Sequence, residues 1–157
     1  MMNMVSKFFN TAGPMQADIH YCVDPLTRVN LDEIMMLIKQ RKYFILHAPR
    51  QTGKTSCLLA LRDYINAGTD YYAVYANIEA GQALRNQVAE VNNAILSSIA
   101  LRAEEVMNNN LTEKIATEVL SSDVQTPITQ FLTRWCLSLD RPLILMLDEI
   151  DALVGDS

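Results

Sequence analysis

The feature that most constrains this chain is a loop that lies between an apolar run and a helical run. The apolar run is residues 43–46, Tyr-Phe-Ile-Leu, and the helical run is residues 57–61, Cys-Leu-Leu-Ala-Leu. A strand, a loop of this type and a helix, in that order, form a phosphate-binding loop. Its backbone N–H groups and the positive end of the helix face the phosphate. The loop residues are Ala48, Pro49, Arg50, Gln51, Thr52, Gly53, Lys54, Thr55 and Ser56.

Two side chains at the end of this loop carry the chemistry of phosphate binding. Lys54 supplies a positive charge to the β- and γ-phosphates, and the Thr55 hydroxyl can ligate Mg²⁺. Gly53 stands where the backbone must approach phosphate, whereas Ala48 replaces the first Gly of the pattern GxxxxGK[ST]. Alanine is the mildest replacement where φ is negative. The alternative interpretation is an ordinary strand–loop–helix turn with a surface lysine.

A second motif lies near the end of the chain, where five apolar residues, 143–147, precede a pair of acids. Such a run predicts a strand buried on both faces in a parallel sheet, and ligands bind at the carboxyl end of strands in open α/β sheets. There Asp148 would hold Mg²⁺, directly or through water, and Glu149 would orient and polarise the attacking water. The alternative is a buried strand that leaves the core through a solvated acidic turn.

Composition narrows the class of protein further. The chain has 157 residues, half of them hydrophobic, which predicts one domain with an ample core. A net charge of −5 without a basic stripe argues against nucleic-acid binding by this segment. Three widely spaced cysteines fit reduced cytosolic thiols. The chain has no signal-peptide core and no membrane-spanning apolar run, so we expect a cytoplasmic protein without a membrane partner.

The remaining pattern predicts strands alternating with helices, and therefore an α/β fold with a parallel sheet covered on both faces. Asn30 with Glu33 predicts a helix start, and Thr126 with Pro127 predicts another. The expected helices begin near residue 31, follow the loop to Asn66, occupy 80–107 as one helix or two, and cover 111–120; a last helix begins at Pro127 and ends before the turn at 140–142. The expected strands are 43–47, 71–78 and 143–147.

Both motifs resemble those of a known class of ATPases. The string Leu-Asp-Glu-Ile-Asp at residues 147–151 is similar to AAA-type ATPases, and the loop at 48–56 resembles bacterial and archaeal AAA-like ATPases, including STAND-related groups. The resemblance implies a three-layer P-loop NTPase fold that binds ATP and Mg²⁺. It implies catalytic roles for Lys54 and Glu149, ATP contacts from residues 48–56, and metal contacts from Thr55 and Asp148. Adenine is preferred over guanine by resemblance, because no NKxD motif occurs.

The lead-in before the first helix resembles a segment that lies against the adenine in such families. This segment covers residues 12–14 and 20–28. The resemblance makes Tyr21, Pro25, Leu26 and Arg28 candidate base-side contacts. The alternative is an ordered arm packed on the core. We therefore expect a lead-in at residues 1–30 and the N-terminal part of a P-loop ATPase domain at residues 31–157.

The resemblance also implies further strands after the acidic one, which carry sensor residues and an arginine finger. We therefore expect an incomplete sheet, with the first three core strands only, that the missing C-terminal half or another protein chain completes. An open slot in a sheet would expose unpaired N–H and C=O groups. In the alternative arrangement, that of P-loop kinases and GTPases, the strands around residues 45 and 145 pair directly.

Three functions are consistent with these motifs. The first is Mg-ATP binding with ATP hydrolysis, and the second is a truncated, non-catalytic nucleotide-binding or interaction fragment. The third is a small-molecule kinase, for which neither an acceptor pocket nor a lid is identifiable. Arg50 would contact a phosphate or a partner, or stay solvated, and Asp151 would face a neighbouring subunit or start a helix.

Overall fold

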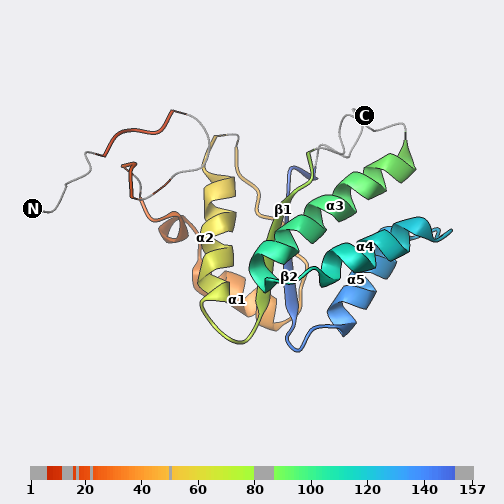
Figure 1. Cartoon of the computed structure of the whole chain (residues 1–157). Coiled ribbons are helices and arrows are strands. Elements are labelled where there is room, and N and C mark those ends of the chain that lie inside the picture. Colours follow the sequence, from red (N-terminus) through yellow and green to blue (C-terminus); the bar gives the residue numbers. More distant parts are fainter. Residues whose placement is uncertain are drawn as a thin grey trace, which may run out of the picture. The chain divides into compact units, whose positions relative to one another are not determined.

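The computed structural model describes residues 7–11, 16, 18–21, 23–49, 51–79 and 87–150 (Figure 1). It divides the chain into two compact units, Met1–Leu61 and Arg62–Ser157. Helix α2 (Lys54–Asn66) begins in the first unit and ends in the second. The predictions for Arg50 and Asp151, and for residues 80–86 of the long helix, lie outside the described residues.

The first unit contains a short 3-10 helix, η1 (Pro25–Arg28), followed by helix α1 (Leu31–Lys39). The predicted helix start at Asn30 is confirmed, because its side-chain oxygen accepts a hydrogen bond from the N–H of Glu33 at 3.2 Å. Helix α1 buries Ile34 and Ile38, which lie one turn apart on its apolar stripe. The local sequence therefore determines where this helix begins and which face it buries.

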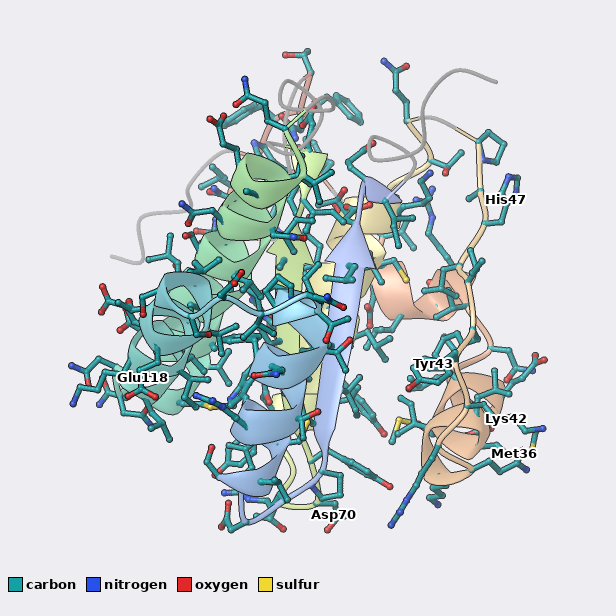
Figure 2. The ribbon with its side chains drawn as sticks, turned by 90° about the vertical axis from the view of Figure 1, so that its right-hand side faces the viewer. Met36, Lys42, Tyr43, His47, Asp70 and Glu118 are labelled. Carbon is teal, nitrogen blue, oxygen red and sulfur yellow. The ribbon has the colours of Figure 1, made fainter. Side chains whose placement is uncertain are left out.

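The predicted strand at 43–47 is wrong. Residues 42–49 form neither helix nor strand, and Figure 2 shows Tyr43 and His47 on this irregular stretch. Tyr43 is fully exposed and Ile45 is 87% exposed. A strand needs a neighbour for its N–H and C=O groups, and no described residue pairs with this segment. The predicted alternative, in which strands around residues 45 and 145 pair directly, is wrong for the same reason, because residues 42–49 form no strand.

The second unit contains the sheet of the described residues, which has two parallel strands. Strand β1 (Tyr72–Asn77) pairs with β2 (Leu143–Asp148) in a register that sets Tyr75 opposite Met146. The predicted strands at 71–78 and 143–147 and their parallel arrangement are thus confirmed, and the fold is α/β. Asn66, the last residue of α2, fixes the start of β1, because its side chain exchanges two hydrogen bonds with the backbone of Ala73.

Three helices connect the two strands and lie on one side of the sheet (Figure 1). They are α3 (Val88–Met107), α4 (Leu111–Ser121) and α5 (Pro127–Leu137). Helix α3 packs on β1, α4 packs on α3, and α5 packs on both of these helices. The end of α3 at Met107 and the starts of α4 at Leu111 and α5 at Pro127 agree with the bounds expected from the sequence. Thr126 precedes α5 as expected, but its side chain makes no capping hydrogen bond.

The core lies between α3–α5 and one face of the sheet. Alternation along the strands brings Val74, Ala76 and Leu145 to this face. The inner faces of α3 and α5 include the buried side chains Ile95, Ile99, Phe131 and Trp135, whereas Val88 at the start of α3 is exposed. The buried cluster consists of Val74, Ala76, Ile78, Ile95, Leu96, Ile99, Ala100, Ala103, Ile115, Ala116, Val119, Phe131 and Trp135.

Trp135 provides a test of this core. Its indole is fully buried against Phe131, and its Nε1–H has no hydrogen-bond partner among the described residues. An unsatisfied buried donor costs about 1–3 kcal/mol. We expect Trp135→Phe to destabilise the fold by less than Phe131→Ala, for which about 3–5 kcal/mol is typical. Urea unfolding of both variants measures the difference, and equal losses would contradict an unsatisfied indole N–H.

Candidate functional site

Two residues of the predicted phosphate loop have a left-handed backbone, and the second of them is followed directly by helix α2 (Lys54–Asn66). Gln51 has φ +59° and Gly53 has φ +82°. The hydroxyl of Thr52 donates to the carbonyl oxygen of Pro49 at 2.7 Å and closes the turn. Adjacent left-handed and right-handed residues, as at Gly53 and Lys54, form a concave group of N–H donors that binds anions. The loop therefore has local geometry suited to a phosphate group.

Helix α2 begins at Lys54, directly after Gly53. Its first intrahelical hydrogen bond runs from the N–H of Cys57 to the carbonyl oxygen of Gly53 at 2.9 Å. The N–H groups of this first turn lie at the positive end of the helix. Lys54, Thr55 and Ser56 make up this first turn and are half-buried. The predicted contact residues 51–56 are thus assembled at one helix N-terminus, and Ala48 and Pro49 lie just before them.

Arg28 lies against this loop. Its Nη1 donates to the carbonyl oxygen of Thr52 at 2.9 Å. Burial raises the pKa of the Cys57 thiol, and the positive charge of Arg28 partly offsets that rise. Arg28 therefore adds a second cation beside the loop that contains Lys54. Sequence reasoning placed Arg28 on the base side by resemblance, and no spacing rule connects η1 with the loop.

The other candidate base-side residues lie in the lead-in. Tyr21 is exposed, and its ring packs against Phe9 with centroids 5.1 Å apart. Pro25 and Leu26 form the first turn of η1 and are half-buried. Backbone hydrogen bonds join Phe8 to Ile19 and to Tyr21, so part of the lead-in is held by its own contacts.

The predicted acidic site lies at the carboxyl end of β2. Asp148 is the last residue of the strand and is only 8% exposed. Its Oδ2 accepts a hydrogen bond from the hydroxyl of Tyr75 at 3.0 Å, and its Oδ1 accepts one from the N–H of Glu149 at 3.1 Å. Sequence reasoning missed Tyr75, because its position beside Asp148 depends on the register between β1 and β2.

Glu149 follows Asp148 with an exposed side chain and φ +59°. A left-handed backbone is uncommon for a residue with a long side chain, and such conformations cluster at functional sites. The turn aims the Glu149 N–H back at Asp148 while its own carboxylate stays accessible to solvent. An accessible carboxylate next to a buried one is suited to accept a proton from water.

The residues present fit a nucleotide-bound Mg²⁺. Carboxylate and hydroxyl oxygens are its preferred protein ligands, and Mg²⁺ in nucleotide sites uses one or two carboxylates together with phosphates and water. Thr55 in the first unit and Asp148 in the second unit each carry an oxygen of this type. Residues 7–150, within the described ranges, contain no group of three or more His, Cys, Asp or Glu side chains that could hold a metal alone. A Mg²⁺ ion carried by a nucleotide does not require one.

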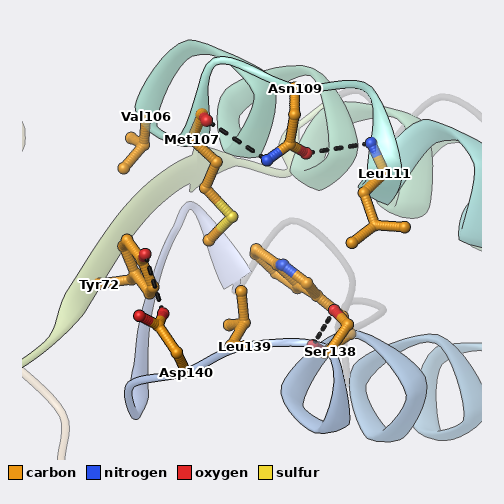
Figure 3. Close-up of a pocket in the computed structure, with 9 residues that line it drawn as sticks. Tyr72, Val106, Met107, Asn109, Leu111, Ser138, Leu139 and Asp140 are labelled. Atoms are coloured by element: carbon orange, nitrogen blue, oxygen red, sulfur yellow. Dashed lines mark hydrogen bonds between the residues drawn. The ribbon is translucent and has the colours of Figure 1, made fainter.

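A cavity of about 280 Å³ lies at the opposite end of the strands (Figure 3). Tyr72, the first residue of β1, lines it, and its hydroxyl donates to the carboxylate of Asp140 at 3.0 Å. Asn109 and Leu139 form other parts of its wall. Since β1 and β2 are parallel, this cavity lies about 17 Å along the strands from Asp148. It is therefore separate from the acidic site.

Gly53 is the loop position where a side chain is least compatible with the structure. A Cβ there would lie 2.9 Å from Nη1 of Arg28, and φ is +82°. We expect Gly53→Ala to cost about 1–2 kcal/mol of stability, mainly from the left-handed backbone, because the Arg28 side chain can move. Gly68→Ala is the matched control, since a Cβ there makes only an ordinary 3.4 Å contact with Ile65. Equal thermal unfolding midpoints for the two variants would contradict the strain at Gly53.

No family model, curated protein or solved structure matches this chain. Among the helices of the described ranges, none has both the length and the apolar character needed to cross a membrane. The functional assignment therefore depends on the loop, the helix start and the acidic strand end.

Proposed function

We propose that the chain binds Mg-ATP as part of an AAA-like P-loop ATPase and supports ATP hydrolysis. The observation that carries the proposal is the phosphate loop, in which the left-handed residues Gln51 and Gly53 lead directly into α2 with Lys54 as its first residue. Such a loop presents N–H donors, a helix N-terminus and an ammonium group to an anion. The buried carboxylate of Asp148 at the end of a parallel strand supports the same function.

The roles follow from the chemistry of each side chain. Lys54 and the loop N–H groups bind the β- and γ-phosphates, while Thr55 and Asp148 hold Mg²⁺. Bound Mg²⁺ neutralises charge that develops on the phosphate oxygens. Glu149 accepts a proton from a water molecule that attacks the γ-phosphorus, the bond to the β-phosphate oxygen breaks, and ADP and phosphate leave.

The proposed fold is the P-loop NTPase sandwich. Its support is the parallel pair β1 and β2, helices between them, and an acid at the carboxyl end of β2. The exposed apolar segment 43–47 favours completion of the sheet by further strands, from the rest of the protein or from another chain. The free thiols Cys57 and Cys136 fit a reducing cytoplasmic location.

The second candidate is a non-catalytic nucleotide-binding or interaction fragment. The exposure of Tyr43 and Ile45 favours it, because a segment that lacks strand partners leaves the loop after it less firmly placed. Such a chain would bind ATP or its missing partner without turnover. Release of inorganic phosphate from ATP by the purified chain, lost in Lys54→Ala, would contradict this second candidate.

Thermal unfolding with and without Mg-ATP tests nucleotide binding. At a hundred times the Kd, binding stabilises a folded chain by about 2.7 kcal/mol. For a domain of this size, that is about 5–11 °C in the unfolding midpoint. Mg-GTP at the same concentration tests base preference, and inorganic phosphate with Mg²⁺ tests whether any anion suffices. An unchanged midpoint with saturating Mg-ATP would contradict the proposed function.

A further inference from the structure

We propose that Tyr75 is the positioning residue of the magnesium site, because it holds the carboxylate of Asp148 in the orientation that Mg²⁺ requires. This inference rests on the proposed function. Tyr75 lies in β1, distant in sequence from both motifs, and neither motif predicts a role for it. Its hydroxyl donates to Oδ2 of Asp148 at 3.0 Å, and both side chains are buried.

The register of the sheet explains how the two side chains meet. Tyr75 pairs with Met146, so Asp148 is two residues further along β2 on the same face. With about 4.8 Å between strands and about 3.3 Å per residue along them, such diagonal neighbours are about 8 Å apart at the backbone, which a tyrosine side chain can span. Val74, Ala76 and Leu145 occupy the opposite face with the α3–α5 core. The tyrosine therefore lies on the face of the sheet that carries the acid.

The two hydrogen bonds to Asp148 restrict its rotation from both sides. Tyr75 bonds to Oδ2, and the N–H of Glu149 bonds to Oδ1. A carboxylate has about four lone-pair sites, so neither of these hydrogen bonds by itself prevents a bond to a metal ion or to its water. Groups that hydrogen-bond to a metal ligand set its orientation, and their removal typically lowers metal affinity about 10–100-fold.

Tyr72 offers a matched control on the same strand. Its hydroxyl also donates to an aspartate carboxylate at 3.0 Å, that of Asp140, but at the amino end of the strands and in an exposed position. Tyr75→Phe and Tyr72→Phe each remove one phenol oxygen and keep the ring. A difference between the two variants therefore reports on the place of the hydrogen bond and not on loss of a tyrosine hydroxyl in general.

The test is calorimetric titration of ATP into the whole chain at a series of MgCl₂ concentrations and in EDTA. We expect Tyr75→Phe to raise the MgCl₂ concentration needed for half-maximal gain in ATP affinity about 10-fold or more. ATP affinity in EDTA should stay unchanged, and Tyr72→Phe should match the wild type in both conditions. A merely structural role for Tyr75 would lower ATP affinity in EDTA as well, so that result would overturn the inference.

Two further outcomes separate this inference from the proposed function. If the wild type binds ATP with Mg²⁺ and Tyr75→Phe shows the same Mg²⁺ dependence, only the role of Tyr75 is overturned. If the wild type binds no ATP in either condition, the proposed function fails and the inference fails with it. Asp148→Asn completes a double-mutant cycle, because an effect that passes through Asp148 should vanish when Tyr75→Phe is added to that variant.

Discussion

Lys54→Ala is expected to abolish the stabilisation of the chain by Mg-ATP, with a loss of affinity of about 10³-fold. Lys54 is the first residue of α2 and follows the left-handed Gly53, and in the proposed function its ammonium group binds the phosphates. A charge pair at 4 Å with an effective dielectric of 20 contributes about 4 kcal/mol, which corresponds to this loss. Thermal unfolding with saturating Mg-ATP should show no shift in the variant.

Lys39→Ala is the matched control for this experiment. Lys39 is an exposed lysine in the last turn of α1, within the same unit of the chain. Its removal changes the net charge equally but should leave the nucleotide response intact. Without nucleotide, Lys39→Ala should unfold within about 0.5 kcal/mol of the wild type, as surface substitutions usually do. An undiminished Mg-ATP shift in Lys54→Ala would contradict the phosphate role of this loop.

Glu149→Gln is expected to slow ATP hydrolysis about 10²–10⁴-fold while ATP binding is retained. Glutamine keeps the size of the side chain and the N–H that donates to Asp148, but it cannot accept a proton from water. A loss of this size makes ATP turnover by the variant very slow. Phosphate release should therefore be followed over hours under single-turnover conditions.

The control for Glu149 is Glu113→Gln, which alters an exposed acid in the first turn of α4. This variant should hydrolyse ATP at the wild-type rate. Equal rates for Glu149→Gln and the wild type would show that Glu149 does not activate water. Binding without measurable hydrolysis by the wild type would instead favour the non-catalytic candidate.

Local features of the sequence predict most of the helices. The side chain of Asn30 accepts the hydrogen bond from Glu33 that starts α1, and α5 begins at Pro127 as expected. These signals act between residues less than one turn apart, so they do not depend on the rest of the chain. The two confirmed strands share another property: each is a continuous apolar or aromatic run that the α3–α5 core can cover.

The strand predicted at 43–47 was wrong for a physical reason. Its composition favours a strand, but composition supplies no partner for its backbone N–H and C=O groups. The described residues give β2 one neighbour, β1, and give this segment none. A helix satisfies its backbone within one segment, whereas a strand depends on another part of the chain.

The residues of the candidate site differ in the same way, because local sequence predicts some of them and tertiary contacts determine the others. The sequence by itself determined the loop residues 51–56, the helix that follows them, and the acid at the end of β2, because these features depend on neighbours along the chain. Only the tertiary structure decided that Arg28 bonds to the loop and that Tyr75 bonds to Asp148. Both contacts join residues far apart in sequence. They depend on the register between strands and on the packing of separate segments, which no local pattern specifies.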